Sequence, residues 1–142
     1  MSGFLLDTNI PSELIRTQPE PRVAQWVRSQ EDRTLFLSAV SIGELRRGFT
    51  MLPAGNRRTR LERWFEDDLL VWFDRRILPL TKTVANRWGV LDGECQLRGM
   101  AANTADGMIA ATALEHDLTL VTRNTKDFTG LGVALLNPWD VT

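Results

Sequence analysis

The fold of this chain is decided by the segment Gly3-Phe4-Leu5-Leu6-Asp7-Thr8-Asn9, which is followed by Ile10 and Pro11. A short apolar run that ends at a turn signal is typical of a buried parallel strand, and a proline fits the first turn of a helix. We therefore expect Asp7 at the carboxyl end of a strand, which is the edge where open α/β sheets bind ligands. The simpler alternative is that Asp7 caps the following helix together with Thr8 or Asn9.

Outward from this segment, apolar runs and helical stripes predict further strands and helices. We expect strands at 34–38, 77–80, 118–122 and 133–136. We expect helices at 10–17, around Val23, Trp26 and Val27, from Ser38 or Ser41 along the inward stripe Ile42, Leu45, Phe49 and Leu52, along 61–73, at 82–97 and at 105–114. Strands that alternate with helices predict a parallel sheet with helices on both faces.

The composition is that of an ordinary globular protein. With 142 residues, 43% hydrophobic and 25% charged, the chain is long enough to form one domain with its own core. It has no apolar window long enough to span a membrane and no signal-peptide pattern after Met1, so we expect a cytoplasmic protein. The lone Cys95 excludes an internal disulfide and a cysteine-based zinc site.

The charge is balanced but unevenly distributed. A net charge of −1 argues against a general electrostatic grip on nucleic acid. Lys82 and Lys126 are the only lysines, so fifteen of the seventeen basic residues are arginines, whose planar forks match phosphate geometry. Many of them fall in the middle of the chain: Arg46, Arg47, Arg57, Arg58, Arg60, Arg63, Arg75 and Arg76. A solvated helix face explains any one of them equally well.

A small set of polar side chains is expected at one edge of the sheet, at strand ends or at the beginnings of neighbouring helices. It consists of Asp7, Glu44, Asp106, Asn124 and Asp127. Taken singly, most have a simpler explanation: Ser41-x-x-Glu44 fits a capping box, Asn103-x-x-Asp106 fits a helix N-terminus, and Asp127 can cap a turn. Those separate explanations do not account for why all of these side chains should lie at the same edge of the sheet.

Several carboxylates within reach of one another are tolerated when a cation neutralises them or when they share protons. Oxygen ligands without His or Cys favour hard ions such as Mg²⁺ or Mn²⁺ over zinc. Such an ion holds a phosphate and lowers the pKa of a bound water. The pattern therefore predicts a divalent metal site that acts on a phosphate ester.

Other catalytic arrangements are missing from the sequence. His116 is the only histidine, so two histidines cannot act as acid and base. There is no Gly-x-Ser-x-Gly elbow, no Gly-rich loop ending in Gly-Lys-Ser/Thr and no Gly-x-Gly-x-x-Gly. Serine-hydrolase, P-loop and dinucleotide chemistry are disfavoured on this ground.

Four segments together are recognisable: LLDTN at 5–9, SAVSIGELRRG at 38–48, ADGMIAATA at 105–113 and VTRNTKDF at 121–128. They resemble the four signature blocks of the PIN domain in its VapC toxin form, in the same order and with similar spacing. The ending Asn137-Pro138-Trp139 is similar as well. The resemblance covers nearly the whole chain.

This resemblance implies a three-layer α/β/α PIN-like domain over residues 1–142, with a mostly parallel sheet of four or five strands. It implies RNA hydrolysis with Mg²⁺ or Mn²⁺ by a metal-activated water, which leaves a 5′ phosphate. Asp7 and Asp106 would be the principal metal ligands and Glu44 a further acidic member. Thr8 and Asn9 would orient Asp7 or the metal water.

The family's fourth acidic position falls on Asn124 here, which is a departure. Either that amide or Asp127, three residues on, fills the position. The likeness also implies a homodimer and a VapB-like antitoxin that blocks the site. Four aromatic side chains are candidates for a surface that takes a partner helix, with core packing as the other interpretation: Trp64, Phe65, Trp72 and Phe73.

Two other functions stay open. An aspartyl phosphatase would use Asp7 as its nucleophile, but that chemistry needs a second acid two residues on, where this chain has Asn9. A catalytically silent PIN-like module would bind RNA or protein without cutting. Clustered Asp7, Glu44 and Asp106 disfavour that module, because a binding surface gains nothing from negative charge facing phosphate.

Overall fold

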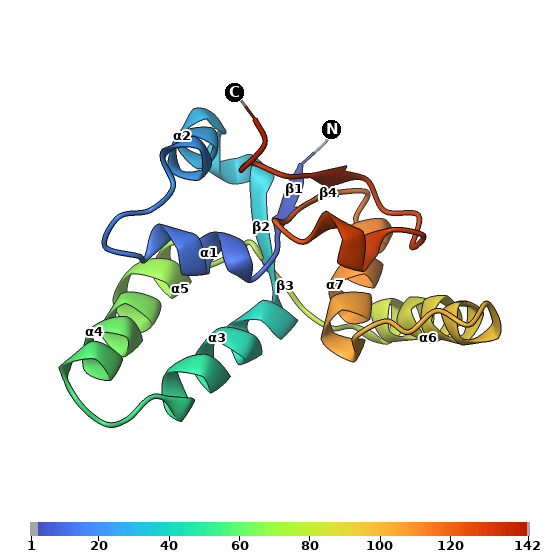
Figure 1. The fold of residues 1–142 in the computed structure, drawn as a ribbon, viewed down its shortest axis with the longest axis horizontal. Helices are drawn as coiled ribbons and strands as arrows, with labels where there is room; N and C mark the ends of the chain where they lie inside the picture. The colour runs from blue at the N-terminus through green and yellow to red at the C-terminus, as the bar shows by residue number, and fades with distance from the viewer. Residues whose placement is uncertain (1–2, 142) are drawn as a thin grey trace.

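The sheet at the centre of the molecule is wholly parallel (Figure 1). A computed structural model describes residues 3–141. The strands are β1 (Phe4–Leu6), β2 (Leu35–Ser38), β3 (Ile77–Leu78), β4 (Thr119–Val121) and β5 (Leu135–Leu136). Their order in space is β3-β2-β1-β4-β5. The parallel sheet expected from the sequence is confirmed.

Strand β1 occupies the middle of this sheet. Its Phe4 pairs with Leu35 of β2 on one side, and its Leu6 pairs with Val121 of β4 on the other. The chain therefore leaves β1 for one half of the sheet and returns later to build the other half. Such a topological switch point opens a crevice at the carboxyl ends of the strands, and Asp7 stands at this end of β1.

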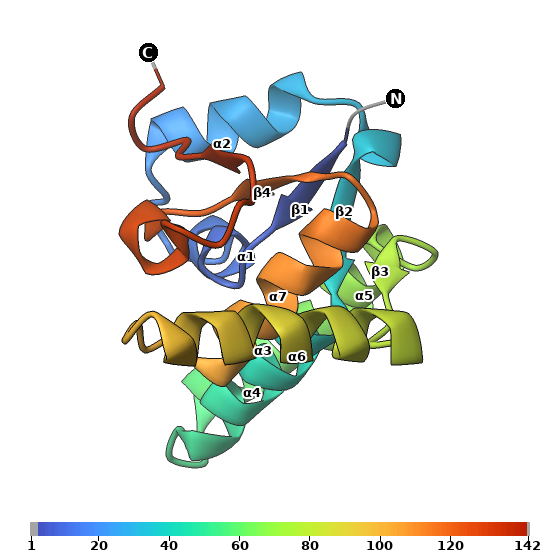
Figure 2. The same ribbon diagram turned by 90° about the vertical axis from the view of Figure 1, so that its right-hand side faces the viewer.

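Helices cover both faces of the sheet and complete the three layers (Figure 2). They are α1 (Asn9–Leu14), α2 (Pro21–Ser29), α3 (Ala39–Met51), α4 (Asn56–Trp64), α5 (Leu70–Trp72), α6 (Lys82–Leu97) and α7 (Thr104–Glu115). Helices α1 to α5 pack on one face, and α6 and α7 pack on the other. Within residues 3–141, none of these helices is long and apolar enough to cross a membrane.

Two apolar cores hold the layers together, because neighbouring residues of β1 point to opposite faces. Leu6 joins the core under α1 to α5, and Leu5 joins the core under α6 and α7. In the second core, Ala110 and Ala113 of α7 are fully buried. Their small side chains let α7 approach the sheet closely, which fixes the position of its N-terminus.

Several element boundaries differ from the expected ones. Helix α1 ends at Leu14 instead of residue 17, because the buried carboxylate of Glu13 accepts the backbone N–H of Glu20 at 2.8 Å and holds the returning chain. Thr34 lies in a 3₁₀ turn, Asp32–Thr34, where its hydroxyl donates to the carbonyl of Glu31. The expected helix along 61–73 consists of α4, a π-helical turn at Phe65–Leu69, and α5.

The aromatic side chains of this segment belong to the core. Phe65 and Phe73 are buried, so core packing is the correct one of the two interpretations for both. Trp64 and Trp72 are partly buried against the same core. Phe65 also packs edge-on against Phe49 of α3. These contacts explain why the Phe65 ring of the π-helical turn points into the core.

Candidate active site at the sheet edge

Asp7 is a buried carboxylate held by hydrogen bonds from three residues. Only 6% of it is exposed. Its Oδ1 accepts the backbone N–H of Thr8 at 2.8 Å, and its Oδ2 accepts the hydroxyl of Thr122 at 2.8 Å and the amide of Asn9 at 3.4 Å. None of these bonds is a side-chain cap on α1. The simple capping explanation for Asp7 is therefore not what the structure shows.

The surroundings of Asp7 oppose its ionisation overall. Burial raises the pKa of this carboxyl above its ordinary value, and the hydrogen bonds from Thr122 and Thr8 lower it in part. The nearby carboxylates of Glu44 and Asp127 raise it further. A carboxylate in this position favours a cation beside it.

Glu44 reaches the site from α3 and is tied to Thr8. The Thr8 hydroxyl lies 2.6 Å from Oε1 of Glu44 and 2.9 Å from the hydroxyl oxygen of Ser41. The helix is capped by Ser38, whose side chain accepts the N–H of Val40. The capping box expected for Ser41 and Glu44 is therefore wrong, and both side chains face Thr8 instead. Thr8 thus orients Asp7 by its backbone and Glu44 by its side chain.

Asp106 lies in the first turn of α7. Asn103 caps this helix and accepts the backbone N–H of Asp106 at 3.2 Å, as its position in the sequence indicates. Burial raises the pKa of Asp106 to about 6, and the charges of Asp7, Glu44 and Asp127 add to the shift. The four carboxylates are therefore close enough to repel one another. We call Asp7, Glu44, Asp106 and Asp127 the acidic rim.

Asn124 and Asp127 follow β4 in different surroundings. Asp127 sits in the 3₁₀ turn Thr125–Phe128, and its charge acts on both Asp7 and Asp106. Both side chains are exposed, and Asn124 donates its backbone N–H to the Thr122 hydroxyl. The 3₁₀ turn thus brings the charge of Asp127 near Asp7 and Asp106.

The rim fits a hard divalent ion bound by few protein ligands. Among residues 3–141, no group of three or more Asp, Glu, His or Cys side chains is arranged to hold a metal ion. Mg²⁺ usually takes one or two carboxylates and completes its shell with waters and phosphate oxygens. Asp7 and Asp106 offer two such carboxylates, and a cation would offset both the burial and the neighbouring charges that raise the pKa of Asp106.

Two hollows open on either side of the rim. A groove of about 860 Å³ contains Thr8 and Glu44 in its wall. A smaller hollow of about 370 Å³ contains Asp106 and Asp127. Residues of the rim therefore line both hollows.

Thr122 and Ser41 are site residues that the sequence did not reveal. Thr122 is fully buried, directly follows Val121 of β4, and stands beside Asp7 because Val121 pairs with Leu6. The signal for it is the register of β1 against β4, which no local pattern contains. The sequence indicates Ser41 only as a possible helix start or capping residue, and its contact with Thr8 depends on how α3 packs.

We expect Thr122→Val to reduce activity while preserving the fold. Valine keeps the shape of threonine but cannot donate to Oδ2 of Asp7, so the carboxylate loses one of its orienting bonds. Loss of such a supporting contact typically costs roughly 10- to 100-fold in metal affinity or activity. The Mg²⁺ concentration that half-saturates a rise in unfolding temperature measures the effect. Thr122→Ser, which keeps the hydroxyl, should stay near wild type; equal Mg²⁺ affinities for both variants would remove Thr122 from the site.

Gly107, directly after Asp106, has no room for a side chain. A Cβ at this position would lie 2.9 Å from both Cδ1 and Nε1 of the Trp88 indole. The indole of α6 therefore rests on the backbone of α7 beside the acidic rim. In residues 3–141, Nε1 of Trp88 is also the one buried side-chain nitrogen or oxygen without a hydrogen-bond partner.

Gly107→Ala should accordingly destabilise the protein by about 1–3 kcal/mol, the usual cost of overpacking a filled site. Alanine has a higher helix propensity than glycine, so without the contact the substitution would stabilise the protein. A loss of stability therefore indicates a clash with Trp88. The matched control is Gly89→Ala in α6, where nothing lies within 4 Å and stability should rise slightly. Urea unfolding of both variants checks this, and a stabilised Gly107→Ala would show that the Trp88 contact is loose.

The fold and the site together define a parallel α/β protein with an acidic site at its switch point. This chain belongs to the PIN domain family, whose model matches residues 4–132. It is 40% identical over 136 residues to "Toxin FitB" of Neisseria gonorrhoeae. That alignment covers 96% of this chain and 98% of the FitB protein. It is 37% identical over 137 residues to "VapC ribonuclease Y4jK" of Sinorhizobium fredii, which covers 96% and 98%.

Solved structures agree with this assignment. The FitAcB crystal structure from Neisseria gonorrhoeae superposes with a TM-score of 0.91 at 39% identity, covering 97% of this chain and 99% of that one. A toxin-antitoxin complex from Klebsiella pneumoniae gives a TM-score of 0.73 at 25% identity, covering 98% and 100%. The chain is thus a homologue of VapC and FitB toxins, and the three-layer PIN fold expected from the sequence is confirmed.

Proposed function

We propose that this protein is a metal-dependent endoribonuclease and the toxin of a toxin–antitoxin pair. The observation that supports it is the acidic rim, gathered from distant parts of the chain at the switch point of a PIN fold. The relatives named as ribonuclease and toxin match nearly the full length of this chain. The proposal carries with it the cytoplasmic location expected from the sequence, where RNA substrates are found. It treats residues 1–142 as one domain.

In this proposal Asp7 and Asp106 hold a Mg²⁺ or Mn²⁺ ion. The bound ion supplies charge neutralisation at the phosphate and lowers the pKa of a water. Thr122 and the backbone of Thr8 fix the carboxylate of Asp7, and Asn9 supports both Asp7 and Thr122. Water is the nucleophile, and a fragment with a 5′ phosphate is the product.

For the fourth acidic position, we propose Asp127. It carries charge within electrostatic reach of Asp7 and Asp106, whereas the Asn124 side chain is uncharged. Glu44, held by Thr8, would complete the negative field that draws a cation to the rim. The backbone of Asn124 then has a supporting role, because it donates to the hydroxyl that holds Asp7.

For the partners, we propose a VapB-like antitoxin and a homodimer. The antitoxin is supported by the structural match to a toxin-antitoxin complex. The homodimer stays a prediction, supported by the exposed apolar side chains of Val90 and Leu97 on α6. Light scattering of the purified chain decides whether it self-associates.

The experiment that tests the function is cleavage of total cellular RNA by the purified protein with Mg²⁺ or Mn²⁺, followed by mapping of the fragment ends. Fragments with a 5′ phosphate and a 3′ hydroxyl support the proposal. RNA that is retarded in a gel but left intact would instead favour the silent binding module. A phosphorylated Asp7, trapped with a small phosphate ester, would favour the aspartyl phosphatase.

A further inference from the structure

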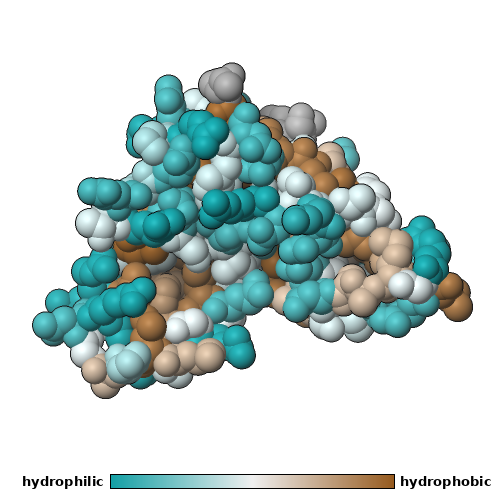
Figure 3. All heavy atoms as spheres, viewed as in Figure 1, coloured by the Kyte–Doolittle hydropathy of each residue, from teal (hydrophilic) through white to brown (hydrophobic). Residues whose placement is uncertain are grey.

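The larger hollow beside the acidic rim has a basic wall. It lies among α1, α3 and α4 and contains Thr8 and Glu44 of the site, together with three arginines, Arg16, Arg57 and Arg60. Figure 3 shows this face from the front, with hydrophobic surface exposed between α1 and the α3–α4 pair and hydrophilic side chains around it. We call this hollow the basic groove.

Two of its arginines are not engaged with the protein. Within residues 3–141, the guanidinium groups of Arg57 and Arg60 have no hydrogen bond or ion pair. They lie one helical turn apart in α4, so they project from the same face of that helix. Arg58, between them, is different: it pairs with Glu62 at 3.6 Å and donates to the carbonyl of Leu52 at 3.4 Å.

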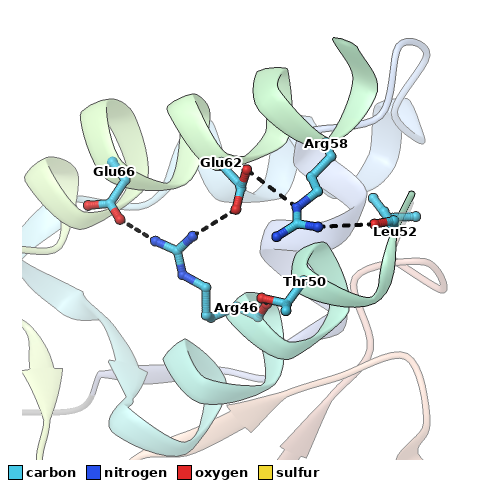
Figure 4. Close-up of polar contacts among 6 residues, drawn as sticks. All are labelled: Arg46, Thr50, Leu52, Arg58, Glu62 and Glu66. Atoms are coloured by element: carbon cyan, nitrogen blue, oxygen red, sulfur yellow. Dashed lines mark hydrogen bonds and ion pairs between the residues drawn. The ribbon is translucent and has the colours of Figure 1, made fainter. Parts of the chain in front are cut away.

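The wall that carries these arginines is braced (Figure 4). Arg46 of α3 bridges Glu62 at 3.2 Å and Glu66, and its guanidinium lies 4.9 Å from the Phe65 ring centre. Together with the Arg58 contacts, these pairs tie α3 to α4 and to the π-helical turn. Arg57 and Arg60 therefore project from a helix that is tied to α3, which carries Glu44 of the rim.

We propose that the basic groove binds the backbone of single-stranded RNA, with Arg57 and Arg60 contacting phosphates beside the one that is cut. This inference rests on the proposed nuclease function and adds where the substrate strand lies. A chain with net charge −1 and an acidic rim repels a polyanion unless cations stand locally along its path. The groove begins at Thr8 and Glu44 and supplies those cations.

The apolar floor of the groove would also suit a segment of a partner protein. The two uncommitted guanidinium groups favour RNA, because Arg forks bind phosphate oxygens bidentately and no ion pair has to be broken here. A partner peptide would need acidic residues at matching positions to satisfy the same two groups. That outcome is distinguished by the experiment.

The test measures binding of a short fluorescein-labelled single-stranded RNA by anisotropy in EDTA, which separates binding from cleavage. Arg57→Ala and Arg60→Ala should each weaken binding, and the double variant should lose roughly fivefold or more in affinity at moderate salt. The slope of log affinity against log salt should flatten by about 0.7 per arginine removed. The matched control is Arg63→Ala, an exposed arginine of α4 that does not line the groove.

Unchanged binding and an unchanged salt slope for the double variant would overturn the proposal. Weaker binding by Arg63→Ala to the same extent would also overturn it, since a diffuse positive charge would then explain the effect. If the double variant bound RNA normally but no longer co-purified with its antitoxin, the groove would be a protein site. Failure of the wild type to cleave RNA in Mg²⁺ is a separate result that tests the nuclease function alone.

Discussion

Asp106→Asn and Asp7→Asn should each abolish metal-dependent RNA cleavage, with a fall of roughly a hundredfold to a thousandfold or more, as for loss of other groups that stabilise developing charge. Each change removes one of the two carboxylates that we assign to the metal ion. Asparagine has nearly the same shape, so the surrounding packing is kept. The measurement is the initial rate of fragment formation in saturating Mg²⁺.

The fold should survive these substitutions, which makes the result interpretable. Asp106 is half-buried and is repelled by Asp7, Glu44 and Asp127, so the amide relieves a repulsion in the metal-free protein. Thermal unfolding should therefore show Asp106→Asn at least as stable as wild type in EDTA at neutral pH. The same variant should also abolish any growth arrest that expression of the wild-type chain causes.

A matched carboxylate outside the site serves as the control. Asp67 is exposed in the π-helical turn and lines neither hollow beside the rim. Asp67→Asn should cut RNA at the wild-type rate. Wild-type rates for Asp7→Asn or Asp106→Asn would remove that residue from the metal site and would leave only the fold in common with nuclease relatives.

The sequence predicted those site residues whose position follows from a local signal. Asp7 was found because it ends an apolar run, and Asp106 because Asn103 marks the start of a helix. Both signals depend on backbone geometry within a few residues. For Ser41 and Glu44 the local signal also allowed a capping box, but Ser38 caps the helix and Glu44 contacts Thr8.

The features that the sequence could not predict depend on contacts between distant segments. Thr122 is beside Asp7 only because of the register of two parallel strands. The π-helical turn at Phe65–Leu69 changes which side chains of its helix face inward, and no spacing rule indicates it. Glu13 ends α1 early through a bond to a residue seven positions away. Strand order was likewise fixed by packing and not by any one segment.

Removal of divalent cations should silence the enzyme, and added Mg²⁺ should restore it. The expected loss is complete because the acidic rim, without a cation, repels the phosphate that it must approach. The measurement is RNA cleavage after dialysis against EDTA, with Mg²⁺, Mn²⁺ and Zn²⁺ added back separately. An oxygen-only donor set should respond to the first two ions and not to zinc. Full activity in EDTA would exclude the metal assignment.

The same ion should raise the unfolding temperature of the protein, and acid should cancel this effect. In the metal-free protein the pKa of Asp106 is raised to about 6, above its ordinary value of 3.8. Protons therefore compete with Mg²⁺ for this carboxylate as the pH falls below about 6. We expect a clear Mg²⁺-induced rise in unfolding temperature at pH 7.5, a smaller one at pH 5.5 and none in Asp106→Asn at either pH.

The raised pKa of Asp106 also sets how the stability of the metal-free protein depends on pH. Because the folded protein holds the Asp106 proton more tightly than the unfolded chain, it binds more protons between about pH 4 and 6. The contribution of this group to stability is therefore greatest at low pH and is lost as the pH rises through about 6. In EDTA, Asp106→Asn should be more stable than wild type at pH 8, and the difference should shrink as the pH falls through 6 and vanish only below about pH 4. A constant difference across that range would show that neither burial nor the neighbouring carboxylates raise the pKa of Asp106.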